Sequence, residues 1–177
     1  MAPPLLLIDI DGVISLFGFD PAQPPPGRFL LVDGMPHFLS AAAAALVTEL
    51  RDDFELVWCS GWEEKADEYL PLVLGLPGGL RHLTFDGDGL DAASADAARS
   101  DTTPRRHWKL AAIDHFAGRR RPLAWIDDGF DDSCHRWARS RPGPTELVAT
   151  EPAVGLTDAH AAQLRRWAQS LRAGGGQ

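Results

Sequence analysis

The chain has 177 residues, of which 45% are hydrophobic and 24% are charged, and its formal net charge is −8. This length and balance suit a globular protein of one domain with its own core. The negative charge offers no general attraction for nucleic acid or for an anionic membrane, although it leaves room for a local basic patch. No apolar stretch approaches the ~20 residues that cross a bilayer. The two cysteines, Cys59 and Cys134, have neither zinc-type spacing nor a disulfide framework, so we expect a cytoplasmic protein.

Short apolar runs alternate with helical patterns along the chain. Buried strands are predicted at residues 5–10, 54–58, 80–85, 123–126 and 145–149, with a short strand or hairpin arm at 29–32. Helices are predicted at residues 36–51, 63–74, 105–116, 131–140 and 157–171. The alternation is typical of an α/β fold in which helices cover both faces of a parallel sheet.

Three segments interrupt this pattern within what we interpret as a single domain spanning residues 1–177. Residues 14–32 include the proline-rich stretch 21–27, and we expect a flap or loop there. Residues 86–104 are rich in Asp, Gly, Ala and Ser and predict a mobile acidic loop. The glycine-rich tail at 173–177 is expected to fray.

Polar side chains follow the predicted strands at the points where these strands end. Asp9 and Asp11 follow the first strand, Ser60 follows the second, and Asp127 with Asp128 follows the fourth. In a parallel sheet, ligands bind beyond the carboxyl ends of the strands. We therefore expect these groups to meet at one edge, together with Lys109 from the helix before the fourth strand.

These residue types suit phosphoryl transfer. A carboxylate can attack phosphorus and form an aspartyl-phosphate, and a second acid can protonate the leaving oxygen. Clustered carboxylates and a phosphate repel one another, so a divalent cation is needed, and Mg²⁺ prefers such oxygen ligands. A serine hydroxyl and a lysine ammonium can hold the remaining phosphate oxygens.

At this point the sequence resembles a known family. Leu-Ile-Asp-Ile-Asp-Gly-Val at 7–13, Trp-Cys-Ser-Gly-Trp at 58–62, Lys109, and Trp-Ile-Asp-Asp at 125–128 resemble the four ordered motifs of the haloacid dehalogenase-like (HAD) superfamily. The resemblance runs from residue 5 to about residue 148. It implies a three-layer, doubly wound, Rossmann-like core with strand order 5-4-1-2-3. The short segment between the first two core strands implies a minimal cap.

The resemblance also implies roles for the acids. Asp9 would be the nucleophile and a Mg²⁺ ligand through its carboxylate. Asp11 would be the general acid/base and would bind the metal through its backbone carbonyl. We expect Asp128 to coordinate the metal directly, and Asp127 to act as a ligand, through water, or by orienting Lys109.

Phosphate binding is expected to involve three further groups: the Ser60 hydroxyl, the Gly61 amide and the Lys109 ammonium. The nearby tryptophans Trp62 and Trp108 are candidates for stacking on a base or sugar, although packing is the commoner role of such residues. Cys59 has no histidine partner in the sequence pattern, which disfavours a thiol nucleophile. Three of the six histidines are expected to be structural or exposed: His37, His107 and His135.

Taken together, the sequence predicts a Mg²⁺-dependent phosphomonoester hydrolase. A phosphoryl transferase or mutase with the same residues is the alternative, as is a non-catalytic binding module of the same fold. Members of the superfamily that attack carbon–halogen bonds generally lack the second acid, so Asp11 disfavours a dehalogenase. We expect a phosphorylated substrate, either a small molecule or a macromolecule. An open site also implies a homodimer as one arrangement, in which the neighbouring subunit covers the site. The motifs are also similar to short actinobacterial-type members and to phosphatase-like domains of some RNA-repair proteins.

Overall fold

The computed structural model describes residues 2–76, 78–85 and 106–174. Its elements in chain order are β1 (Leu5–Ile8), β2 (Ser15–Leu16), β3 (Gly27–Val32), β4 (Met35–Ser40), α1 (Ala41–Leu50), β5 (Glu55–Trp58), α2 (Lys65–Leu74), β6 (Arg81–His82), α4 (Leu110–Ala117), β7 (Leu123–Asp127), α5 (Asp132–Ser140), β8 (Thr145–Ala149) and α6 (Asp158–Gly174).

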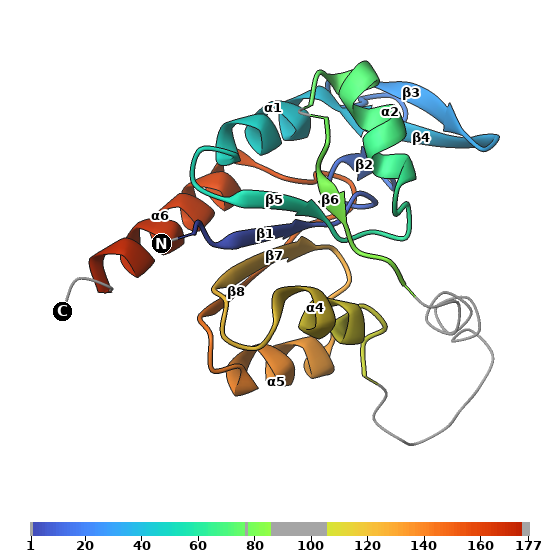
Figure 1. Ribbon diagram of the computed structural model, residues 1–177. Coiled ribbons are helices and arrows are strands. Elements are labelled where there is room, and N and C mark those ends of the chain that lie inside the picture. The colour runs from blue at the N-terminus through green and yellow to red at the C-terminus, as the bar shows by residue number, and fades with distance from the viewer. Residues whose placement is uncertain (1, 77, 86–105, 175–177) are drawn as a thin grey trace.

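The main sheet has five parallel strands in the order β6-β5-β1-β7-β8 (Figure 1). Numbered along the chain, these are the five core strands in the predicted order 5-4-1-2-3, and the α/β, Rossmann-like fold is confirmed. β1 lies at the centre, where Leu7 pairs with Val57 of β5 on one side and with Trp125 of β7 on the other. This order brings the ends of β1, β5 and β7 together.

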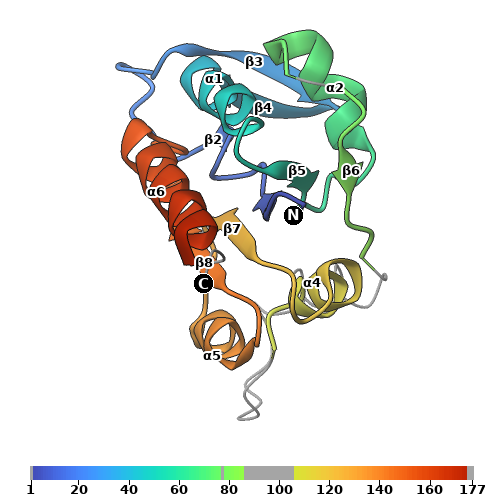
Figure 2. The same cartoon turned by 60° about the vertical axis from the view of Figure 1, so that its left-hand side comes forward.

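Helices cover both faces of this sheet, with α1, α2 and α6 on one face and α4 and α5 on the other (Figures 1 and 2). Successive side chains of β1 point to opposite faces, so its four residues divide between two cores. Leu6 and Ile8 pack in the first core, while Leu5 and Leu7 pack in the second. All four are fully buried, which explains why the strand is a continuous apolar run.

A second, antiparallel sheet of order β2-β4-β3 is formed by the part of the chain between β1 and α1, which includes the predicted flap. The predicted helix at 36–51 is wrong over its first five residues, because β4 continues to Ser40 and α1 begins only at Ala41. The Ser40 hydroxyl accepts the amide hydrogen of Ala43 and caps the helix there. In β4, Phe38 pairs with Phe29 of β3, so cross-strand pairing overrides the helical pattern. The flap therefore reaches beyond the predicted 14–32.

Three other boundaries also differ from the prediction. The predicted strand at 80–85 reduces to β6, which pairs with β5 only through Arg81 and His82. α4 begins at Leu110 rather than at 105, and α6 continues to Gly174, beyond the predicted end at 171. The predicted acidic loop at 86–104 and the last three residues of the tail lie outside the described residues. Within the described ranges, no helix combines the length and the apolar character needed to cross a membrane.

Candidate active site

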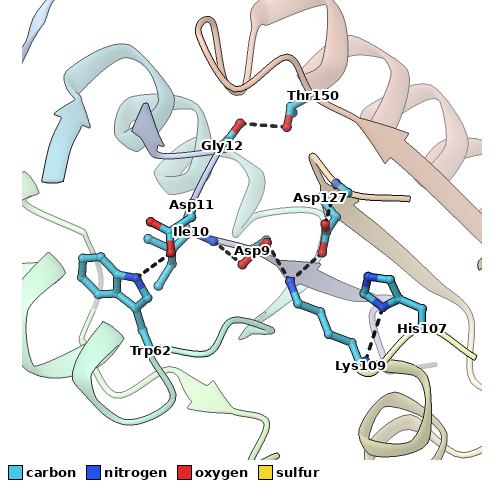
Figure 3. Close-up of polar contacts among 10 residues, drawn as sticks. Asp9, Ile10, Asp11, Gly12, Trp62, His107, Lys109, Asp127 and Thr150 are labelled. Atoms are coloured by element: carbon cyan, nitrogen blue, oxygen red, sulfur yellow. Dashed lines mark hydrogen bonds and ion pairs between the residues drawn. The ribbon is translucent and has the colours of Figure 1, made fainter. Parts of the chain in front are cut away.

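Asp9 follows β1 directly, and its carboxylate is paired with Lys109. The Lys109 ammonium nitrogen lies 2.6 Å from Asp9 Oδ2 and 2.7 Å from Asp127 Oδ2 (Figure 3). The three residues are 2–6% exposed and come from the end of β1, the turn before α4 and the end of β7. Their convergence at one edge of the sheet agrees with the arrangement predicted from the sequence.

Burial and neighbouring charges together determine the protonation of Asp9 and Lys109. Loss of water raises the pKa of Asp9 to about 7, with Asp127 adding to the rise and Lys109 opposing it. Burial alone would lower the pKa of Lys109, but the charges of Asp9 and Asp127 outweigh burial and raise it. Lys109 is therefore held as a cation, and its one charge is divided between two carboxylates.

The turn after β1 is held in a tight conformation by its backbone. The Ile10 amide donates to Asp9 Oδ1 at 2.8 Å and fixes the rotation of the carboxylate. Gly12 has φ +72°, and a Cβ placed there would lie 2.3 Å from Asp128 Oδ2. The Thr150 hydroxyl, which follows β8, donates to the Gly12 carbonyl at 2.9 Å (Figure 3). Only glycine fits this turn, since a side chain would displace the Asp128 carboxylate.

The two acids at the end of β7 have different surroundings. Both oxygens of Asp127 are engaged, Oδ2 with Lys109 and Oδ1 with the Gly129 amide at 2.9 Å. Asp128 lies against Gly12 and is less buried than Asp127. Burial, and then the charge of Asp127, raises the pKa of Asp128. This geometry favours the expected division, in which Asp127 orients Lys109 and Asp128 is available to a metal.

The donor set suits a hard divalent cation. Carboxylate oxygens of Asp9, Asp127 and Asp128 lie within 4.8 Å of one another. Three carboxylates with a single ammonium leave uncompensated negative charge in a largely buried site. Burial, with the charge of Asp127 adding to it, raises the pKa of both Asp9 and Asp128. Mg²⁺ is the cation that best matches oxygen donors of this kind. The residues present therefore fit the metal that the resemblance implies.

Around these groups lies a cleft of about 400 Å³, which the described residues leave open to solvent. Its lining includes every predicted site residue except Trp62: Asp9, Asp11, Ser60, Gly61, Lys109, Asp127 and Asp128, together with His107, Trp108 and Gly129. Ser60 and Gly61 follow β5 and line the same cleft as the acids. The structure thus brings an acidic cluster, a lysine, a hydroxyl and a backbone amide to one cavity.

Asp11 has two side-chain partners that the sequence did not reveal. Its Oδ2 accepts the indole hydrogen of Trp62 at 3.0 Å, and its Oδ1 lies 3.3 Å from His37 Nδ1. Trp62 is 8% exposed, which leaves little ring surface for the predicted stacking. His37 comes from β4, which was predicted as helix, so no sequence signal connected it to Asp11.

His107 is a second histidine with a place in the site. It lines the cleft beside Lys109, its ring packs edge-on against Trp125, and burial lowers its pKa. Trp108 also lines the cleft, so its predicted stacking role stays a prediction. Burial raises the pKa of the Cys59 thiol far above its ordinary value, which leaves no thiolate for nucleophilic attack.

Comparison with known proteins gives one family match. Residues 5–161 match the family model described as the HAD domain in Swiss Army Knife RNA repair proteins. The match extends from the first residue of β1 into α6 and contains all the site residues described above. A search of curated proteins found no match.

Proposed function

The chain belongs to the family of HAD domains in Swiss Army Knife RNA repair proteins, and on that basis we propose that it is a Mg²⁺-dependent phosphatase that hydrolyses phosphomonoesters through an aspartyl-phosphate on Asp9. Membership of the HAD superfamily supports a phosphoesterase or related activity. The observation that supports a phosphatase mechanism through an aspartyl-phosphate is the position of Asp9. Its buried carboxylate faces a cleft that also holds a cationic lysine, a second acid and a serine hydroxyl.

In the first step, the Asp9 carboxylate forms a bond to phosphorus while the bond to the leaving oxygen breaks. Asp11 gives its proton to that oxygen. Lys109 offsets the negative charge of the phosphoryl group, and the Ser60 hydroxyl and the Gly61 amide donate to its oxygens. The Ile10 amide holds Asp9 Oδ1, so that Oδ2, on the Lys109 side, is the oxygen we assign to the attack.

In the second step, water attacks the phosphorus of the aspartyl-phosphate. The Asp11 carboxylate accepts the proton of that water, and the bond between phosphorus and Asp9 breaks to release inorganic phosphate. Both side chains then have their starting protonation. The carboxylates of Asp9 and Asp128 would hold Mg²⁺, together with the backbone carbonyl of Asp11 that the resemblance implies, and the ion would supply positive charge for the phosphoryl oxygens.

For the substrate we propose a terminal phosphate of RNA. The family description supports RNA, and a cleft that the described residues leave open supports a chain end rather than an enclosed metabolite. The net charge of −8 disfavours broad contact with the RNA backbone, so recognition would be confined to the end that enters the cleft. The two free, buried cysteines support action in a reducing compartment such as the cytoplasm.

The test is phosphate release from an aryl phosphate and from oligoribonucleotides phosphorylated at either end, with Mg²⁺ or with EDTA. We expect Mg²⁺-dependent release by the natural protein and a loss of at least ~10³-fold in Asp9→Asn. Asp52→Asn, at an exposed position away from the cleft, is the matched control and should retain activity. Absence of turnover across the whole panel, with Mg²⁺ present, would contradict the proposal.

A further inference from the structure

The carboxylate of Asp11 accepts a hydrogen bond at one oxygen and lies close to a histidine at the other, and the two neighbours come from different parts of the fold. Trp62, in the turn after β5, donates its indole hydrogen to Oδ2 at 3.0 Å. His37, in β4 of the small sheet, places Nδ1 3.3 Å from Oδ1. Figure 3 shows the Trp62 contact on the side of Asp11 that points away from Lys109.

The two partners are themselves fixed in place. His37 and Trp62 pack edge-on with ring centroids 4.5 Å apart, and the Ser15 hydroxyl lies 3.1 Å from His37 Nδ1. Trp62 and Ser15 are both buried. The side chain of Asp11, by contrast, lines the cleft and is 47% exposed, so without these neighbours fewer contacts would restrict its rotamers.

The contact between Trp62 and Asp11 differs from the surroundings of two other tryptophans. The indole nitrogens of Trp58 and Trp125 are buried without a protein hydrogen-bond partner among the described residues, whereas the indole of Trp62 donates to Asp11. A carboxylate at 47% exposure, in turn, has no need of protein partners for its solvation.

We propose that Trp62 and His37 are positioning residues that hold Asp11 in the orientation required to protonate the leaving oxygen. This inference rests on the proposed function. In the step concerned, the proton of Asp11 passes to the leaving oxygen as the phosphorus–oxygen bond breaks and the bond to Asp9 forms. Misplacement of a reacting group by ~1 Å costs about 10²-fold in rate, so loss of either partner should act through this proton transfer.

The dependence of the rate on the leaving group tests this. A poor leaving group, such as the alkoxide of an alkyl phosphate, needs the proton, whereas 2,4-dinitrophenolate does not. We expect Trp62→Phe to lower kcat/KM for an alkyl phosphate by about 10–100-fold, and for 2,4-dinitrophenyl phosphate by less than about 3-fold. In an Asp11→Asn background, Trp62→Phe should cause almost no further loss on the alkyl phosphate.

Trp137→Phe is the matched control. It removes an indole-to-carboxylate hydrogen bond of 2.9 Å, to Asp114, from a tryptophan that is 7% exposed and does not line the cleft. Its effect should be the same on both substrates. His37→Phe provides a second test and should repeat the pattern of Trp62→Phe, while His37→Asn, whose amide can replace Nδ1, should restore much of the rate.

Equal losses on the two substrates in Trp62→Phe and His37→Phe, or additive losses in the Asp11→Asn background, would overturn the positioning role and leave the phosphatase proposal intact. Absence of turnover of both substrates by the natural protein would instead overturn the proposed function, and the positioning role with it.

Discussion

The ammonium of Lys109 lies 2.6 Å from the Asp9 carboxylate in a site where both residues are almost fully buried. The pair has two consequences. It keeps the lysine charged, because burial of an unpaired ammonium would lower its pKa. It also leaves Asp9 incompletely compensated, since the same ammonium serves Asp127.

Replacement of Lys109 by Met should therefore affect both activity and stability. We expect kcat to fall by about 10²–10³-fold, the usual effect of removing one group that stabilises transition-state charge. The free energy of unfolding should fall by about 3–5 kcal/mol, because a buried carboxylate loses its partner. Steady-state kinetics and urea unfolding measure the two effects.

A double-mutant cycle makes the stability part of this prediction sharper. Lys109→Met combined with Asp127→Asn should destabilise the protein by less than the sum of the single changes, because the uncompensated charge is removed as well. Strict additivity would contradict the pairing described here.

Gly12→Ala should damage the site rather than the fold alone. The new Cβ would lie 2.3 Å from Asp128 Oδ2, and the backbone has φ +72°. Gly18 has a similar φ of +77° with nothing within 4 Å of its Cβ position, so Gly18→Ala is the matched control. Both variants should lose about 1–2 kcal/mol from backbone strain, but only Gly12→Ala should lose phosphatase activity. Equal activity in the two variants would show that contact with Asp128 is unimportant.

Mg²⁺ should stabilise the folded protein, because its carboxylate ligands come together only on folding. At 100 times its dissociation constant, the ion should add about 2.7 kcal/mol to the free energy of unfolding. Thermal unfolding with and without Mg²⁺ measures this. Asp128→Asn should lose most of the shift, while Asp52→Asn, at an exposed position, should keep it. A full shift in Asp128→Asn would remove that residue from the metal site.

Asp131 gives a stability prediction that depends on pH. It caps α5 by accepting the amide hydrogens of Ser133 at 2.7 Å and Cys134 at 3.0 Å. Burial tends to raise its pKa, but the hydrogen bonds prevail and lower it. Because the folded pKa is below the unfolded one, the ionised cap stabilises the protein above about pH 4 and loses this effect as the pH falls further.

We therefore expect Asp131→Ala to cost about 1 kcal/mol at pH 7. The difference from the natural protein should shrink at pH 3, as measured by urea unfolding at both values. Asp131→Asn, which keeps a capping oxygen, should cost less at pH 7. A cost for Asp131→Ala that is the same at both pH values would exclude the ionised cap as its source.

The strand order and most of the site could be predicted from the sequence, because they depend on short segments that can be recognised one at a time. Each core strand is a short apolar run, and the polar residue that follows it lies at the carboxyl edge of the sheet by topology alone. Asp9, Ser60 and Asp127 were located in this way. Thr150 follows β8 and anchors the Gly12 carbonyl, and the same argument would have found it.

The small sheet was harder to predict, because its pairing is not local. Residues 36–40 lead directly into the alanine run of α1, and only their pairing with β3 makes them a strand. Because the sequence pattern at 36–40 predicts a helix, it gives no indication that His37 lies near Asp11. The choice between Asp127 and Asp128 as metal ligand likewise depended on which carboxylate Lys109 contacts, a distance that sequence spacing does not define.

The central claim, that Asp9 becomes phosphorylated, is tested most directly by chemical trapping. Protein mixed with Mg²⁺ and a phosphorylated substrate is quenched in acid and reduced with borohydride, which converts an aspartyl-phosphate to homoserine, and the peptides are then sequenced by mass spectrometry. With 2,4-dinitrophenyl phosphate as the substrate, whose leaving group needs no proton from Asp11, we expect homoserine at position 9, more of it in Asp11→Asn, in which water is activated more slowly, and none in Asp9→Asn. Trapping at another residue, or continued turnover by Asp9→Asn, would contradict this claim.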